Sequence, residues 1–196
     1  MFPDQIEKSD LLQLPLIRFE GEIRVIEKPE DLDRSLDIIS RESILGFDTE
    51  TKPTFTKGAY NHTALIQFST LDEAFLLRIN RFGIPDRLKK IMENENIRKI
   101  GISLRDDLKD LKKLRPFRPA GFIDLNNIAK DLGINQIGIK SLTGIFLERR
   151  ISKNQQTSNW ENHKLTPAQK RYAATDAWIC MKMYDSLLQR GFVEAS

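Results

Sequence analysis

Two carboxylates stand two residues apart directly after a short apolar stretch. Ile44–Phe47 reads as a buried β-strand, and Asp48 and Glu50 follow it. Side chains alternate between the two faces of a strand, so both acids point to the same side. Converging carboxylates repel each other and lose hydration, and a divalent cation that binds both relieves that repulsion. A match as short as Asp-x-Glu is common by chance, and such acids are usually solvated in a loop. Whether this pair binds a metal therefore depends on further ligands elsewhere in the chain.

A third acid lies on the inward face of a predicted helix. Ser103 and Asp106 form the Ser-x-x-Asp pattern of a capping box, which predicts a helix from Leu104 to about Leu114. At about 100° per residue, the leucines of this helix form one stripe; Asp107 lies within its margin, whereas Asp106 lies nearly opposite. Asp107 is therefore the candidate metal ligand, and a buried hydrogen bond to backbone amides is the alternative explanation.

The last predicted helix carries a fourth acid in the centre of its apolar face. Thr166 as the cap and Pro167 at the first helical position predict where this helix begins. Tyr172 and Asp176 are four residues apart and share the apolar face. Core packing alone would explain Tyr172. An isolated ionised carboxylate in a core is costly, so Asp176 requires a partner or a metal ion.

These side chains have the composition of a metal-dependent nuclease site. Oxygen-only ligands suit Mg²⁺ or Mn²⁺, and the two histidines, His62 and His163, are not spaced as a zinc site. Two such ions about 3.5–4 Å apart activate a water and stabilise the leaving oxygen in phosphodiester cleavage, without a protein nucleophile. The pattern therefore predicts two divalent cations held by Asp48, Glu50, Asp107 and Asp176.

The segments that must position these residues alternate between strands and helices. Apolar runs predict strands near 23–26, 44–47, 64–68, 74–79, 97–102 and 122–124. Amphipathic periods predict helices near 29–39, 84–93, 104–114, 125–132, 140–149 and from 167 onward. Asp124 is read as the N-cap of the helix at 125–132 rather than as a ligand. The pattern indicates an α/β fold with a partly antiparallel sheet.

Length and composition predict one globular domain. The 196 residues are 40% hydrophobic and 30% charged, and the net charge of +3 permits nucleic-acid binding without demonstrating it. Residues 1–20 follow no clear period and are read as an N-terminal arm before a domain over residues 21–192. The single cysteine, Cys180, excludes an internal disulfide. Without a signal-peptide or membrane-length apolar run, we expect a soluble, intracellular protein, cytoplasmic or, in a eukaryote, nuclear.

Three segments resemble the exonuclease motifs of the DEDD superfamily, in its tyrosine-containing branch. They are Phe47–Glu50, Ile100–Asp107 and Tyr172–Asp176. The resemblance extends from about Gly21 to Leu188 and is greatest to exonuclease domains of the Werner type, while ribonuclease D shares the same motifs. It implies a ribonuclease-H-like (DnaQ-like exonuclease) fold, with a central mixed five-stranded sheet flanked by helices, and removal of nucleotides from a 3′ end.

The resemblance also implies a role for each candidate residue. Asp48 would bridge both metal ions, Glu50 and Asp176 would complete the first metal site, and Asp107 would hold the second ion directly or through water. Tyr172, together with Glu50, would orient the attacking water. The pair Arg105-Asp106 departs from relatives that often carry a small or aromatic residue before the second-motif aspartate.

Nucleic-acid contacts are predicted outside this catalytic set. Arg149, Arg150 and Lys153 precede the segment around Trp160, and Phe55 and Tyr60 lie in a loop after Glu50 where either could stack on the terminal base. A second cluster, formed by Lys109, Lys112, Lys113, Arg115 and Arg118, is more simply a solvated helix face.

The expected partner is the 3′ end of nucleic acid, with no membrane. DNA is favoured because the extra helical domains usual in ribonuclease D are absent from this sequence. Trimming of RNA 3′ ends and a catalytically silent nucleic-acid-binding module are the alternatives, and the sequence does not indicate an oligomeric state.

Overall fold

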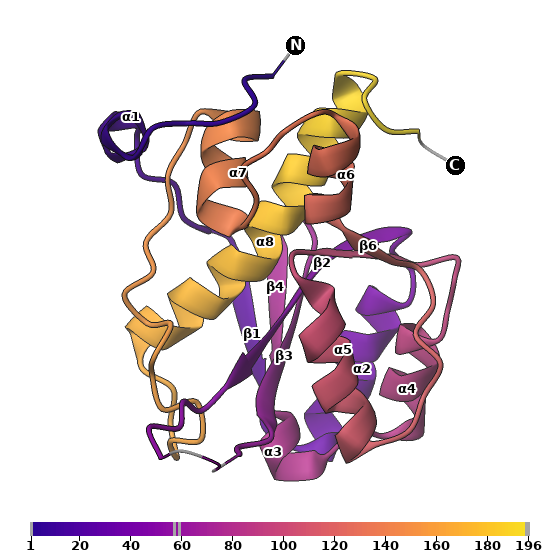
Figure 1. The fold of residues 1–196 in the computed structure, drawn as a ribbon. Coiled ribbons are helices and arrows are strands. Elements are labelled where there is room, and N and C mark those ends of the chain that lie inside the picture. The colour runs from indigo at the N-terminus through magenta and orange to yellow at the C-terminus, as the bar shows by residue number, and fades with distance from the viewer. Residues whose placement is uncertain (1, 57, 59, 195–196) are drawn as a thin grey trace.

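The computed structural model describes residues 2–56, 58 and 60–194; two positions of the predicted loop after Glu50, Lys57 and Ala59, lie outside this range. Within the described part, six strands form one mixed sheet in the order β1-β4-β3-β2-β5-β6 (Figure 1). They are β1 (Glu22–Ile26), β2 (Ile44–Thr51), β3 (Thr63–Ser69), β4 (Glu73–Leu77), β5 (Arg98–Gly101) and β6 (Phe122–Asp124). β2 lies inside the sheet, antiparallel to β3 and parallel to β5.

The sixth strand is an addition to the five that the resemblance implied. β1 pairs in parallel with β4 at one edge of the sheet. Glu22 lies opposite Glu73 at the start of the pairing, and Ile26 lies opposite Leu77 at its end. The residues of β1 predicted a strand on their own, and the apolar side chains Ile23, Val25 and Ile26 pack into the hydrophobic clusters beside the sheet. The ribonuclease-H-like arrangement is therefore extended at this edge.

Helices cover both faces of the sheet (Figure 1). α2, α4 and α5 pack against one face, whereas α6, α7 and α8 gather on the other. The helices are α1 (Lys8–Gln13), α2 (Pro29–Ile39), α3 (Ile79–Phe82), α4 (Asp86–Met92), α5 (Leu104–Leu114), α6 (Leu125–Asp131), α7 (Ile139–Leu147) and α8 (Pro167–Gln189). None of the helices in the described part of the chain has the length and apolar character needed to cross a membrane.

Strand alternation in β2 assigns its side chains to these two layers. Leu45 and Phe47 belong to the core beneath α2, α4 and α5, whereas Ile44 packs in the core beneath α8. Gly46, Asp48 and Glu50 follow Ile44 at intervals of two residues, so their side chains are on the same face as Ile44. β2 extends to Thr51, farther than the predicted strand at 44–47, so both acids lie within the strand on the α8 side of the sheet.

α8 packs directly on β2 because Gly46 has no side chain. A Cβ atom at Gly46 would lie 2.0 Å from the backbone oxygen of Ala177 and 2.5 Å from Ser69 Oγ. The helix begins as predicted, with Thr166 as N-cap, Pro167 in the first turn and a capping box completed by Gln169. This close contact places the middle of α8 over the end of β2.

The start of α5 differs from the predicted capping box. Ser103 has a left-handed backbone with φ of 61°, and its side chain caps nothing. The carboxylate of Asp124 instead accepts hydrogen bonds from the backbone amides of Ser103 (3.1 Å), Leu104 (3.0 Å) and Asn126 (2.9 Å). β5 and β6 are adjacent parallel strands, so the end of β6 lies beside the start of α5. Asp124 therefore caps α6, as predicted, and also α5.

The N-terminal segment lies along α7 and the end of α8. Phe2 packs against Phe146 and Phe192, with ring centroids 4.9 and 4.8 Å apart. Further on, the amide of Ile17 donates to the backbone oxygen of Arg150 at 2.8 Å. The segment is thus fastened to the rest of the molecule, while the division at residue 20 stays a prediction.

Candidate active site

Three of the predicted carboxylates converge at the contact between β2 and α8. One oxygen from each of Asp48, Glu50 and Asp176 lies within 4.8 Å of the others. Asp176 is 1% exposed and Glu50 is 8% exposed, while Asp48 is half-buried. The strand alternation of β2 and the close packing of α8 over Gly46 together produce this cluster.

The cluster is electrostatically unfavourable for three ionised acids. Burial, and after it the negative charges of Asp48 and Asp176, raise the pKa of Glu50 to about 10. The pKa of Asp48 is raised well above its usual range, first by burial and then by Asp176 and Asp107. Without a cation, the site therefore retains protons at neutral pH.

Lys153 supplies a positive charge inside this cluster. Its Nζ lies 2.6 Å from Asp176 Oδ2 and 3.0 Å from the hydroxyl oxygen of Tyr172. The lysine side chain is 15% exposed. Its charge and its position just before the Trp160 segment predict a nucleic-acid contact, whereas nothing local in the sequence indicates its link across 23 residues to α8.

Tyr172 presents a protonated hydroxyl to the acids. Burial, and after it the charge of Asp176, raises the pKa of Tyr172 above its usual value. The ring packs near Trp160, with centroids 5.9 Å apart. The hydroxyl accepts from Lys153 and keeps its own proton for a hydrogen bond.

Asp107 approaches from the other layer of the molecule. It is half-buried on α5, and the hydroxyl of Thr49 donates to its Oδ1. Burial raises the pKa of Asp107 to about 6, against the lowering effect of that hydrogen bond. Its oxygens lie outside the group of three, although its charge acts on Asp48. Thr49 was missed in the sequence, where its position between the two acids, facing the opposite layer, was the available signal.

The donor set fits hard divalent cations. All the acids offer oxygen, which Mg²⁺ and Mn²⁺ prefer. Asp176 Oδ1 is buried and has no hydrogen-bond partner within the described part of the chain, so a carboxylate oxygen remains free to bind an ion. Asp48, Glu50 and Asp176 could hold one cation together, with Asp107 beside them.

The other predicted nucleic-acid residues lie outside the acid cluster. Phe55 is 88% exposed and Tyr60 is 47% exposed, both in the loop after β2. Arg149 is exposed and donates to the backbone oxygen of Glu148. Arg150 is half-buried, and its Nε donates to the backbone oxygen of Leu14 at 2.9 Å. Arg150 therefore holds the N-terminal segment in place.

Comparison with known proteins gives a consistent result. A family model described as 3′-5′ exonuclease matches residues 23–191. The chain is 32% identical, over 93% of its length, to the mouse protein named bifunctional 3′-5′ exonuclease/ATP-dependent helicase WRN. It is 27% identical, over 85% of its length, to ribonuclease D of Gluconacetobacter diazotrophicus. It spans 14% of the mouse protein, 42% of that ribonuclease D and between 27% and 40% of three other relatives.

Solved structures share the fold. The Nibbler EXO domain from Aedes aegypti superposes with a TM-score of 0.79 at 22% identity, covering 89% of this chain and 91% of that domain. Ribonuclease D from Trypanosoma brucei, in a complex with the RNA U12, superposes with a TM-score of 0.74 at 20% identity, covering 92% of this chain and 64% of that one. Both similarities support the ribonuclease-H-like α/β fold.

Proposed function

The chain belongs to the family of 3′-5′ exonucleases, and from that premise we propose that it hydrolyses phosphodiester bonds at the 3′ end of nucleic acid to release nucleoside 5′-monophosphates. We place it in the tyrosine-containing branch of the DEDD superfamily. The observation that carries the proposal is the convergence of Asp48, Glu50 and Asp176 beside the hydroxyl of Tyr172. Membership of the family makes the chain a nuclease; the site residues and the mechanism are what we propose.

Each side chain has a task in the proposed mechanism. Asp48, Glu50 and Asp176 bind metal, and Asp107, held by Thr49, completes the set. Two divalent cations, Mg²⁺ or Mn²⁺, supply water activation and stabilisation of the leaving oxygen when bound. Tyr172 and Glu50 orient the attacking water through hydrogen bonds. Lys153 fixes the hydroxyl of Tyr172 and the carboxylate of Asp176 relative to each other.

We propose DNA as the preferred substrate. The mouse relative, 32% identical, is named an exonuclease and helicase rather than a ribonuclease, and this difference from the 27% identical ribonuclease D is what supports the choice. Trimming of RNA 3′ ends is the second candidate. The bacterial relative named ribonuclease D and the structural similarity to a ribonuclease D complex with RNA favour it equally.

One cleavage experiment tests the function and separates the two substrates. A 5′-labelled single strand and a duplex with a recessed 3′ end, each as DNA and as RNA, are incubated with Mg²⁺, with Mn²⁺ and with a chelator. We expect a ladder that shortens from the 3′ end, requires metal and is stronger on DNA. A stronger ladder on RNA would select the second candidate. Binding without any ladder would instead indicate a silent nucleic-acid-binding module.

A further inference from the structure

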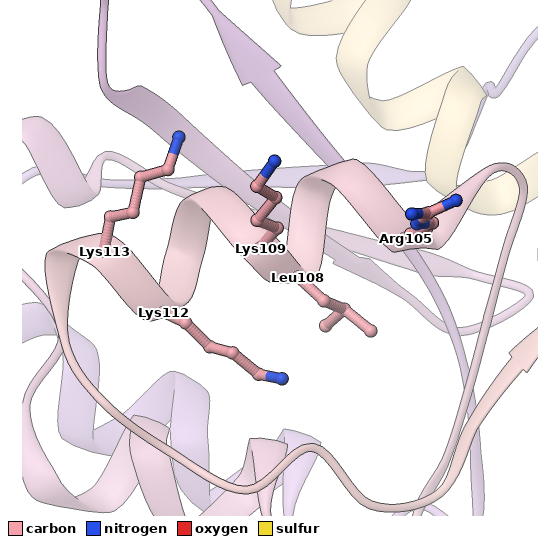
Figure 2. Close-up of a pocket in the computed structure, with 5 residues that line it drawn as sticks. All are labelled: Arg105, Leu108, Lys109, Lys112 and Lys113. Carbon is pink, nitrogen blue, oxygen red and sulfur yellow. The ribbon is translucent and has the colours of Figure 1, made fainter.

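The outer side of α5 carries cations that have no part in the site described above. Arg105, Lys109, Lys112 and Lys113 are exposed, and with Leu108 they line a shallow hollow of about 450 Å³. Figure 2 shows Lys109 and Lys113 extending from one side of the helix and Lys112 from the other, with Arg105 at the end nearest the helix start. These four residues are called the α5 basic face below.

Charge is segregated around α5. At about 100° per residue, the four cations fall within an arc of about 100°, and Asp107 lies nearly opposite the centre of that arc. Asp106, which is exposed, and Asp110 stand beside the arc, and Asp110 pairs with Lys113 at 2.7 Å. Within the described part of the chain, no ion pair joins Arg105, Lys109 or Lys112 to an acid. Three positive charges therefore remain available to an anionic partner.

One aromatic side chain, that of Tyr60, adjoins the basic face at Lys113. Lys113 Nζ lies 4.2 Å from the centre of the Tyr60 ring. Tyr60 and the still more exposed Phe55 belong to the loop that follows Glu50. Basic groups interleaved with exposed aromatic rings are typical of surfaces that bind single strands. The contact between Lys113 and Tyr60 links one end of the basic face to the part of the chain that follows Glu50.

Resting on the proposed function, we propose that the α5 basic face binds backbone phosphates of the substrate several nucleotides away from the 3′ end that is cleaved. Residues four positions apart on a helix are about 6 Å apart along its axis, so the row Arg105, Lys109 and Lys113 spans about 12 Å. That length covers roughly two to three phosphates of an extended single strand, whose successive phosphates lie farther apart than the axial rise of about 3.4 Å in a duplex strand. The recognised chemistry is the phosphodiester backbone, which DNA and RNA share.

Binding without metal tests this surface separately from catalysis. Fluorescence anisotropy in chelator compares 20-nucleotide and 4-nucleotide single strands, each as DNA and as RNA. For the triple variant Arg105→Gln, Lys109→Gln, Lys112→Gln, we expect the Kd for the 20-nucleotide strand to rise at least about tenfold near 0.1 M salt. The slope of log K against log salt should fall by about 2, since each single-strand phosphate contact contributes about 0.7. The Kd for the 4-nucleotide strand should change less than about twofold.

A matched variant controls for net charge. Lys8→Gln, Lys28→Gln, Lys130→Gln removes three exposed charges outside α5, and thermal melting verifies that both variants fold. Equal losses in the two triple variants, or equal losses for short and long strands, would overturn the proposal. Cleavage by the unaltered protein is measured in parallel. A missing ladder with α5-dependent binding would overturn only the proposed function, and a ladder with α5-independent binding would overturn only this surface.

Discussion

Asp48 must be ionised to bind a metal ion, but an ionised Asp48 destabilises the folded, metal-free protein. Its carboxylate must ionise to bind a cation, yet its surroundings raise its pKa well above the usual range. The same conflict holds for Glu50, whose pKa is raised to about 10. Acids arranged in this way stabilise a bound cation and destabilise the protein without one.

The conflict predicts a specific dependence of stability on pH. Between the ordinary carboxyl pKa, near 4.5 for Glu50, and its folded value near 10, the folded state binds more protons than the unfolded state. Stability of the metal-free protein should therefore fall as pH rises through this window. Asp48→Asn should reduce that fall, raising the melting temperature in chelator at pH 9 by roughly 2–8 °C, or about 1–2 kcal/mol.

Calorimetry at pH 6 and pH 9, with chelator and with Mn²⁺, measures this effect. Asp48→Asn should also lose both the stabilisation by Mn²⁺ and cleavage. Asp106→Asn, at an exposed position on α5, serves as the control and should behave like the unaltered protein. Identical pH slopes for the unaltered protein and Asp48→Asn would contradict the assignment of Asp48.

The hydroxyl of Tyr172 has a separate, kinetic prediction. Tyr172→Phe removes the group that Lys153 holds, without changing the packed ring. We expect kcat to fall about 100-fold while the Kd for a single strand changes less than about twofold, because the hydroxyl orients water rather than substrate. Tyr184→Phe, on the same helix but in a different hydrophobic cluster from Tyr172, is the control. A loss in affinity as large as the loss in kcat would exclude a water-orienting role.

The contact of α8 with β2 is the structural element on which the cluster depends. At Gly46, an added methyl group would meet the backbone of Ala177, which cannot move aside without shifting the helix. Gly46→Ala should destabilise the protein by about 1–3 kcal/mol. The displaced helix should also separate Asp176 from Asp48, so activity at low temperature, where the variant is folded, should fall more than tenfold.

Gly144→Ala is the matched control for this substitution. Its added methyl group would meet the ends of the Leu11, Ile6 and Leu14 side chains, which can adjust, rather than a backbone atom. Melting curves and steady-state rates at low temperature compare the two variants. Full activity in Gly46→Ala would show that the acid cluster does not depend on the close contact between α8 and β2, which would contradict this prediction.

At the scale of the whole molecule, the N-terminal segment supports the irregular segment that leads from Arg150 to Lys153. Leu16 and Arg150 form a parallel bridge, and the amide of Arg150 donates to the backbone oxygen of Pro15 at 3.0 Å. Phe19 is 1% exposed, and its amide donates to Thr175 Oγ1 at 3.1 Å on α8. Residues 15–19 therefore pack beside the site, whereas residues 2–14 lie farther along α7.

Two truncations separate these parts. Removal of residues 1–14 should lower the melting temperature while keeping kcat within about threefold. Removal of residues 1–20 also deletes Phe19 and the bridge to Arg150, and should cost about 3–5 kcal/mol and at least tenfold in kcat, measured where the protein is folded. Equal activity of the two truncated proteins would show that residues 15–20 do not support the site.

The sequence by itself predicted the six strands and the helices α2 and α4 to α8, and which side chains share a face, but it missed the short helices α1 and α3. Alternation in β2 placed Asp48 and Glu50 together, and the helical period placed Tyr172 beside Asp176 and turned Asp107 inward. These features depend on periods of two and 3.6 residues, which are local and can be counted along the chain. The resemblance of three ordered motifs added the fold, although it implied one strand fewer than the sheet contains.

Only the tertiary structure decided which distant groups meet. Lys153 reaches Asp176, Thr49 holds Asp107, and Asp124 caps two helices, because strand order and helix docking bring these segments together. The predicted capping box at Ser103 was wrong for the same reason. The carboxylate of Asp124, at the end of the neighbouring strand β6, accepts the hydrogen bonds of the backbone amides of Ser103 and Leu104 in its place. Contacts of this kind depend on the packing of the whole sheet and its helices, and no local period encodes them.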